Sequence, residues 1–94
     1  MYALAVKPDV DKTFAKLVKK DRKQLLAIGK KIEEIRANPH HVYKFLRKPL
    51  QRYNRVHIDS NFVLIFRIDH NEQTVTVYAY DHHDAIYKWR PASD

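Results

Sequence analysis

The sequence has no cysteine, a single glycine and only two serines, Ser60 and Ser93, and each shortage removes a class of chemistry. Without cysteine there is neither a disulfide framework nor a thiolate zinc site, and the redox compartment stays open. One glycine excludes the glycine-rich loops that cradle nucleotide phosphates. With so few serines and no Gly-x-Ser-x-Gly turn, the nucleophile of a serine hydrolase is also missing. Chemistry by histidine, carboxylate and basic side chains remains.

Long apolar runs are lacking too. None approaches the roughly 20 residues that a membrane span requires. The N-terminal segment MYALAVKPDV is too short, and too soon interrupted by charge, for a secretory signal. We therefore expect a cytoplasmic protein with no membrane partner. A chain of 94 residues with 45% hydrophobic content predicts one domain, residues 1–94, around one core.

Acidic residues are absent between Glu34 and Asp59, in a chain with a formal net charge of +7 and a pI of about 9.7. Basic residues alternate with aromatic ones there, a pattern that suits phosphate contacts and stacking on bases. The interval predicts nucleic-acid binding, with a solvated basic face or a surface for an acidic protein as alternatives. Its basic residues are Arg36, Lys44, Arg47, Lys48, Arg52 and Arg55, and its aromatic residues are Tyr43, Phe45 and Tyr53.

The first third of the chain predicts a strand and two helices. Residues 2–6 are apolar and stop at Lys7 and Pro8, which indicates a strand. Asp9 or Asp11 is the expected N-cap of a first helix of about ten residues. Its expected core face consists of Val10, Phe14, Leu17 and Val18.

A second helix is expected to begin after Asp21 and to end at Asn38 and Pro39. Its apolar residues recur at helical spacing, so that one face meets a core. The two helices should form an antiparallel hairpin. The apolar residues of the second helix are Leu25, Ile28, Ile32 and Ile35.

The second half of the chain changes to the alternating period of strands, over residues 53–58, 62–68 and 74–80. Three consecutive strands predict an antiparallel meander, and the first strand should pair with its edge. In the last strand, Val75, Val77 and Ala79 are expected on one face. The fold class is α+β, with the helices on one face of the sheet. The basic loop from Pro39 to Arg52 is expected to be functional.

The segment DHHDAIYKW, Asp81 to Trp89, places two histidines beside two carboxylates. Neighbouring residues on a strand point to opposite faces, so one ion would rarely take both His82 and His83, and we expect no metal centre and no cofactor. Acid and base chemistry on RNA needs less, because the ribose supplies its own nucleophile. His57, on an alternating strand, and His82 could then serve as proton-transfer groups beside basic side chains.

The order of these elements resembles the RelE/ParE superfamily of small toxins. The resemblance covers essentially the whole chain and rests on RYNRVHIDSNFVLIFRID, on TVTVYAY and on the terminal IYKW. Members of the RelE branch cleave messenger RNA without metal, typically in the ribosomal A site, and an antitoxin silences them. Members of the ParE branch instead poison DNA gyrase. The resemblance therefore implies the toxin of a type II toxin–antitoxin system, with an antitoxin, messenger RNA and the ribosome as partners.

Within this superfamily the motifs are most similar to those of YafQ-type toxins, which use histidines. His57 and His82 match two histidines of that group, and Asp84 stands in the place of its terminal aspartate. Asn61 replaces an acidic residue, and Lys44 replaces a further histidine.

Against the RelE pattern itself, Arg55 and His57 occupy the places of two lysines, and Tyr87 that of the terminal tyrosine. Val63 replaces an arginine, which keeps open a catalytically inactive RNA-binding homologue. A gyrase inhibitor is the other alternative. The resemblance implies that His57 and His82 share the acid and base roles, that Arg55 with Arg52 stabilises the phosphorane, and that Tyr87 stacks on or orients a base. The expected RNA-binding residues are Lys44, Arg47, Lys48, Arg52, Asn61 and His83, and Trp89 is expected to anchor the tail by packing.

Overall fold

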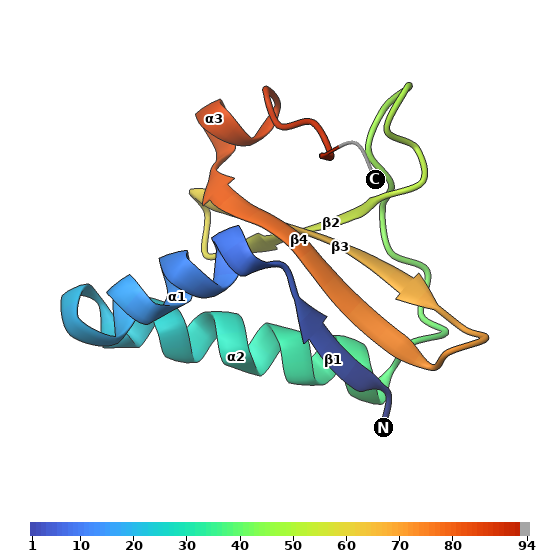
Figure 1. The fold of residues 1–94 in the computed structure, drawn as a ribbon, viewed down its shortest axis with the longest axis horizontal. Coiled ribbons are helices and arrows are strands. Elements are labelled where there is room, and N and C mark those ends of the chain that lie inside the picture. The colour runs from blue at the N-terminus through green and yellow to red at the C-terminus, as the bar shows by residue number, and fades with distance from the viewer. Residues whose placement is uncertain (93–94) are drawn as a thin grey trace.

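Within residues 1–92, which the computed structural model describes, four strands form one mixed sheet in the order β1-β4-β3-β2 (Figure 1). Two long helices cover one face of this sheet, so the predicted α+β class is confirmed. None of the helices in this described part is long and apolar enough to cross a membrane. The strands are β1 (Ala3–Val6), β2 (Asn54–Ile58), β3 (Phe62–Asp69) and β4 (Thr74–His82), and the helices are α1 (Pro8–Lys20), α2 (Arg22–Ala37) and α3 (His83–Ile86).

Helix α1 begins at Pro8 with Lys7 as its N-cap, so the predicted cap at Asp9 or Asp11 is wrong. Proline suits the first helical position, because its missing N–H is one that a helix leaves without an internal partner. Asp9 and Asp11 lie in the first turn instead, where carboxylates interact favourably with the helix dipole. The helix has 13 residues rather than about ten, and Val18, expected in the core, is exposed.

Helix α2 begins and ends as the sequence predicted. The side chain of Asp21 accepts a hydrogen bond from the backbone N–H of Gln24 at 3.0 Å, which is the N-cap interaction. Asn38 is the C-cap residue. The buried residues Ile28, Ile32 and Ile35 of this helix belong to the core beneath it.

The predicted meander is confirmed, because β2 pairs with β3 and β3 with β4 in antiparallel register. Strand β1 pairs with the free edge of β4, as expected, in parallel register from Ala3 opposite Thr74 to Val6 opposite Val77. One irregularity interrupts the pairing of β3 with β4. Ile65 lies opposite Ala79 and Phe66 opposite Val77, so Tyr78 is an extra residue in β4.

This β-bulge changes which side chains of β4 face the helices. Val75 and Val77 pack in the core beneath the helices, as predicted, but Ala79 belongs to the cluster on the other face. The expectation that Ala79 shares a face with the two valines is therefore wrong, because an inserted residue reverses the alternation beyond it. Tyr80 consequently packs on the helix side.

Both faces of the sheet are covered. On the side away from α1 and α2, α3 and the following residues pack on β3 and β4, with Val63, Ile65, Ala79 and Ile86 buried. Trp89 contacts the rings of Tyr53 and Tyr78 edge-on, with centroid distances of 5.1 and 6.4 Å. The predicted anchoring of the tail by Trp89 is confirmed. The partly buried residues around this second cluster are Leu46, Tyr53, Tyr78 and Trp89.

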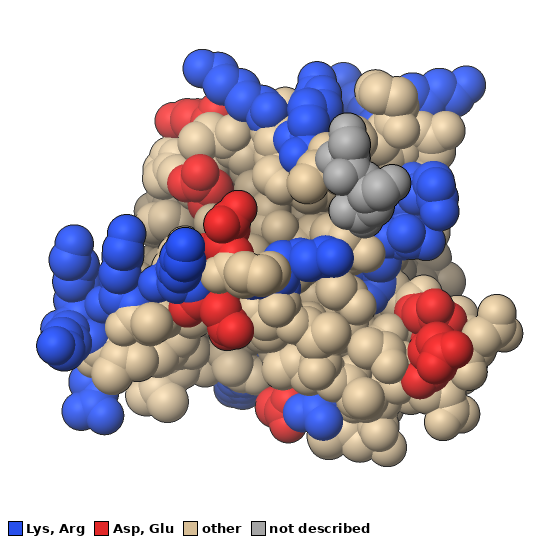
Figure 2. All heavy atoms as spheres, viewed as in Figure 1, with Lys and Arg blue, Asp and Glu red and all other residues tan. Residues whose placement is uncertain are grey.

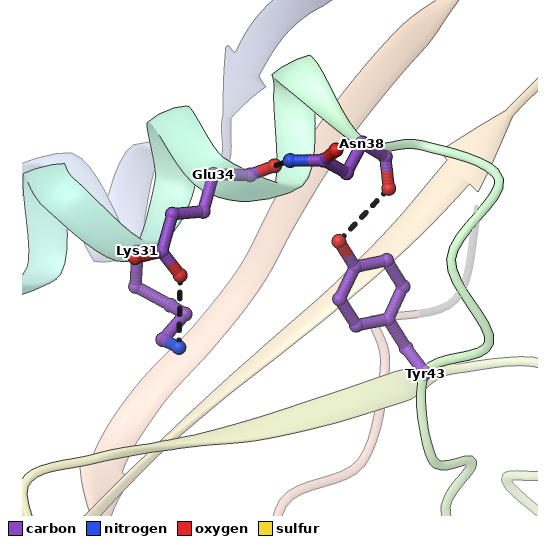
Figure 3. A network of polar contacts seen from close by, with 4 residues as sticks. All are labelled: Lys31, Glu34, Asn38 and Tyr43. Carbon is purple, nitrogen blue, oxygen red and sulfur yellow. Dashed lines mark hydrogen bonds and ion pairs between the residues drawn. The ribbon is translucent and has the colours of Figure 1, made fainter.

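The loop of residues 38–53 is held in place by hydrogen bonds. The hydroxyl of Tyr43 donates to the carbonyl oxygen of Asn38 at 2.9 Å, and the side-chain amide of Asn38 donates to the carbonyl of Glu34 (Figure 3). Lys31 pairs with the Glu34 carboxylate in the same network. Burial, with the nearby charge of Glu34, raises the pKa of Tyr43 above its ordinary value.

Candidate nucleic-acid interface

A cavity of about 430 Å³ lies on the face of the sheet opposite α1 and α2. It is formed where loop 38–53, β2 and the segment after α3 meet, and we refer to it as the first cavity. Among its lining residues, all of them in the described part of the chain, four carry positive charge and none is acidic. The lining residues are Phe45, Leu46, Arg47, Lys48, Pro49, Leu50, Arg55, Ile86, Tyr87 and Arg90.

Strand β2 places Arg55 in this cavity by simple alternation. Val56 and Ile58 pack on the helix side, so Arg55 and His57 project to the opposite face. There Arg55 lies opposite Ile65, and His57 lies opposite the buried Val63. Arg55 is half-buried, whereas His57 is exposed and does not line the cavity.

The C-terminal segment brings Tyr87 to the other side of the cavity. Ile86 of α3 is buried in the second cluster, which fixes the short helix on the sheet. Tyr87, the next residue, is 60% exposed. Arg90 follows one turn later, and its guanidinium donates to the carbonyl oxygens of Tyr87, at 3.2 Å, and Trp89, at 2.7 Å. The cavity thus has a fixed cationic wall beside an available aromatic ring.

A second group of predicted residues gathers at the end of β4, beside the β2–β3 turn. The backbone N–H of His83 donates to the carbonyl oxygen of Asn61 at 2.8 Å. The rings of His82 and His83 lie 4.5 Å apart between centroids. His82 also packs edge-on against Phe62, at 5.5 Å, and Phe62 contacts the core beneath the helices.

The register does not bring His57 and His82 onto one face. His57 is aligned with Val63 and Val63 with Asp81, while His82 is opposite Phe62 on the helix side. The bulge in β4 is the cause. If β4 paired with β3 without this bulge, uninterrupted alternation from Val77 onward would direct His82 to the same face as His57.

Three side chains at this strand end could hold a metal ion. His82, His83 and Asp84 each offer a ligand atom, and these atoms lie within 4.8 Å of one another. The Nδ1 atoms of His82 and His83 lie 3.5 and 3.0 Å from the Asp84 carboxylate oxygens. The expectation that His82 and His83 diverge is therefore wrong, because the chain turns from strand to helix between them. Only half-exposed and exposed side chains contribute.

The remaining predicted RNA-binding residues lie along the loop. Lys44 is exposed, and its backbone carbonyl accepts a hydrogen bond from the N–H of Arg55 at 2.9 Å. Arg52 lines a different cavity of about 360 Å³, which we call the second cavity. Figure 2 shows Lys and Arg gathered over the top and upper right of the view, where Figure 1 draws α3 and this loop. The second cavity is lined by Pro39, His41, Val42, Tyr43, Phe45, Arg52, Asn54, Arg67, Ile68 and His70.

Sequence reasoning missed two basic residues of these cavities, Arg90 and Arg67. Arg90 stands three residues after Tyr87, so its position beyond the IYKW motif was an available signal. Arg67 lies on a predominantly apolar strand, and its guanidinium carbon is 5.6 Å from the centre of the Tyr53 ring. Nothing in the local sequence points to that contact, because it joins β3 to the segment before β2.

Comparison with known proteins identifies relatives that extend over nearly the whole chain. No family model matches the sequence. A protein of Methanocaldococcus jannaschii named "Putative toxin RelE4" is 54% identical over 88 residues, 94% of this chain and 93% of that protein. An uncharacterized protein of Methanosarcina mazei is 49% identical over 87 residues, 93% of this chain and 100% of that protein.

Solved structures with lower sequence identity share the fold. The YoeB–YefM complex of Staphylococcus aureus matches with a TM-score of 0.75 and 14% identity, over 88% of this chain and 98% of that one. The RelBE2 toxin–antitoxin complex of Mycobacterium tuberculosis matches with a TM-score of 0.71 and 23% identity, over 87% of this chain and 98% of that one. The YoeB/ParE toxin of Agrobacterium tumefaciens matches with a TM-score of 0.75 and 15% identity, over 86% of this chain and 98% of that one. With the near full-length relative at 54% identity, these matches show that the chain belongs to the RelE/ParE superfamily of toxins.

Proposed function

We propose that this toxin is a metal-independent endoribonuclease that cleaves messenger RNA, acting on the ribosome. The observation that carries the proposal is the first cavity. Four cations, Arg47, Lys48, Arg55 and Arg90, surround a space whose lining, within residues 1–92, includes no acid, and the exposed Tyr87 lies beside it. Such a cavity favours a phosphate flanked by a base.

The reaction requires two proton transfers and charge stabilisation. The 2′ oxygen of the ribose attacks phosphorus, the bond from phosphorus to the 5′ oxygen breaks, and the products carry a 2′,3′-cyclic phosphate and a free 5′ hydroxyl. We assign removal of the 2′ hydroxyl proton to His57, which is exposed on the same face as Arg55. Arg55 stabilises the negative charge that develops on the phosphorane. Arg52, which was expected to share this role, lines the second cavity instead and is assigned to bind a phosphate further along the RNA.

Protonation of the 5′ oxygen is assigned to His82. Because the register directs this ring toward the helix side, the scissile phosphate must lie at the open end of the sheet, near Ile58 and Phe62, for both imidazoles to reach it. Attacking and leaving oxygens lie in line on opposite sides of phosphorus, so acid and base need not be neighbours. His83 and Asn61 lie at the same end of the sheet and are assigned to bind the RNA there.

The remaining contacts hold the RNA backbone or ribosomal RNA. Lys44, Arg47 and Lys48 occupy successive parts of the loop and can neutralise phosphates along a strand. Tyr87 stacks on or orients a base at the first cavity. An antitoxin completes the proposal, because the RelBE2 neighbour and a YoeB–YefM neighbour, from two bacteria, are described as toxin–antitoxin complexes. Its acidic and apolar residues would cover the basic face or the α1–α2 hairpin.

The test is induction of the protein in a bacterium, followed by mapping of transcript ends by primer extension. In-frame cuts in translated messages are expected. The His57→Ala variant should lose about a hundredfold or more in cleavage rate, the usual effect of removing a proton-transfer group. His40→Ala is the matched control, because this exposed histidine stacks on His70 outside the first cavity.

Three outcomes would contradict the proposal in different ways. Intact transcripts with induced DNA repair would identify a gyrase inhibitor instead. Wild-type cleavage by a His57→Ala, His82→Ala double variant would remove the imidazole mechanism. Loss of cleavage after dialysis against EDTA, restored by added metal, would make the metal-independent reaction wrong and direct attention to His82, His83 and Asp84.

A further inference from the structure

Phe45 is the aromatic residue of the basic interval whose ring stays available to solvent. Tyr43 is packed edge-on against Phe66, at a centroid distance of 5.4 Å, and its hydroxyl is bonded to Asn38. Tyr53 packs against Tyr78 and Trp89. Phe45 is 58% exposed. Of the three rings that the sequence offered for stacking on bases, two are therefore half-buried and packed against other aromatic rings.

The exposure of Phe45 does not come from a loose loop. Phe45 forms an isolated β-bridge with Asn54. Two main-chain hydrogen bonds of 2.9 Å flank this bridge. The N–H of Leu46 donates to the carbonyl oxygen of Tyr53, and the N–H of Arg55 donates to the carbonyl oxygen of Lys44. The segment thus acts as a short extra strand along the edge of β2. A ring held this way loses little conformational entropy when a ligand stacks on it.

Phe45 also lines both cavities. On one side lies the first cavity with Arg47, Lys48, Arg55 and Arg90. On the other lies the second cavity with Arg52 and Arg67, next to the apolar side chain of Val42, which is 87% exposed. Neither set of lining residues, all within residues 1–92, includes an acid. An exposed aromatic residue between two positively charged cavities is suited to bind a polyanion that carries planar bases.

We propose that Phe45 is a stacking ridge over which single-stranded RNA passes from the first cavity into the second. One base stacks on the Phe45 ring, and Arg52 and Arg67 neutralise phosphates of the nucleotides beyond it. Single-stranded RNA is the occupant, since paired bases do not present their faces to a protein side chain. This inference rests on the proposed function and adds a second binding region, which fixes how far the substrate extends from the cleaved bond.

The experiment measures the anisotropy of a fluorescent 2′-O-methyl RNA of about 12 nucleotides, which binds but cannot be cleaved. Phe45→Ala should weaken binding about tenfold or more, the effect expected for the loss of one stacked base. Phe45→Trp should retain the affinity. Leu26→Ala is the matched control, because Leu26 is an equally apolar residue, 75% exposed, on α2. It should bind as the wild type does.

Two further measurements distinguish a ridge from a merely structural role. A dinucleotide too short to span both cavities should bind Phe45→Ala and Arg67→Gln with little change from wild type. For the long RNA, Arg52→Gln and Arg67→Gln should each lower the slope of log affinity against log salt by about one, as expected when one phosphate contact is removed. An unchanged slope in both variants would exclude the second cavity from the path.

The outcomes separate this inference from the proposed function. If the wild type binds no RNA, the nuclease proposal and the ridge fail together. If the wild type binds and cleaves RNA while Phe45→Ala has full affinity, only the ridge is wrong. If Phe45→Ala is unfolded by circular dichroism, the folded Phe45→Ser variant or the Phe45→Trp comparison decides, because a ridge requires an aromatic ring at this position.

Discussion

The carbonyl oxygen of Asn61 accepts a hydrogen bond from the N–H of His83 at 2.8 Å, which joins the β2–β3 turn to the start of α3. The contact uses main-chain atoms on both sides. The turn residue can therefore be changed without releasing the helix that carries Tyr87. Replacing the Asn61 side chain therefore tests the proposed RNA binding separately from the stability of the fold.

Asn61→Ala should leave the melting temperature unchanged and weaken RNA binding by about two- to tenfold, the worth of one hydrogen bond of about 0.5–1.5 kcal/mol. Thermal unfolding and anisotropy with a non-cleavable RNA measure the two effects. Ser60→Ala, in the same turn, is the control and should change neither. Full affinity in Asn61→Ala would show that the side chain does not contact RNA, and a lowered melting temperature would show that it contributes to the fold.

Val63→Arg should destabilise the fold strongly. Val63 is fully buried in the cluster that contains Ile86, and an arginine there would be an unpaired charge in an apolar site. We expect a loss of about 3 kcal/mol or more in the free energy of unfolding, measured by urea denaturation. Val42→Arg, at a highly exposed position, should change it by less than about 0.5 kcal/mol. A stable Val63→Arg protein would mean that α3 does not seal this site. The arginine of the RelE pattern cannot simply be restored at this position.

Asn54→Ala should loosen loop 38–53. The buried amide of Asn54 donates to the carbonyls of Tyr43, at 3.3 Å, and Lys44, at 3.4 Å, and its removal leaves both without this partner. The expected cost is about 1–3 kcal/mol of stability, with faster hydrogen exchange at residues 44–46. Asn71→Ala, in the exposed β3–β4 turn, should have no such effect. Unchanged exchange in Asn54→Ala would assign the order of the loop to the Tyr43 contacts and to the main-chain hydrogen bonds of Leu46 and Arg55.

Tyr80 should make the protein sensitive to alkali. Burial, with the charges of Asp59 and Asp21, raises the pKa of Tyr80 above its ordinary value of 10.0, and the hydroxyl donates to the side-chain oxygen of Gln24 at 2.7 Å. In the unfolded chain this tyrosine loses its proton near pH 10, whereas in the folded protein it keeps it.

The contribution of Tyr80 to the free energy of unfolding is therefore fully present below about pH 10. It falls as the pH rises above this value, because the folded state then binds more protons than the unfolded state. The Tyr80→Phe variant should be less stable at neutral pH, through loss of the bond to Gln24, but should show a smaller decline from pH 10 upward. Urea denaturation across this range tests the slope. Tyr87→Phe, at an exposed position, should keep the wild-type slope. An unaltered slope in Tyr80→Phe would place the alkaline sensitivity elsewhere, with Tyr43 the next group to replace.

Local sequence patterns were enough to predict α1, α2 and the four strands. The isoleucines of α2 recur at helical spacing and Asp21 precedes them, so both the buried face and the N-cap followed from the sequence. The start of α1 did not follow from the sequence, because a proline such as Pro8 can either end a strand or begin a helix. Lys7 is not a residue type that favours the N-cap position, so it gave no sign that the helix begins at Pro8.

The sequence predicted which residues meet at the candidate site better than it predicted the faces on which their side chains lie. The basic interval and the terminal tyrosine do meet, at a cavity that contains Arg47, Lys48, Arg55 and Tyr87. The relative faces of His57 and His82 were not predictable. They depend on the bulge between Ile65 and Phe66, and a one-residue shift in register reverses every side chain beyond it.

The pairing of β1 with β4 has a consequence for how the toxin is made. Residues 3–6 are synthesised well before their partners, residues 74–77, so the sheet cannot close until β4 has been made. The first cavity is also completed late, because its lining extends to Arg90. Both the closed sheet and this cavity therefore form only once nearly the whole described chain has been made.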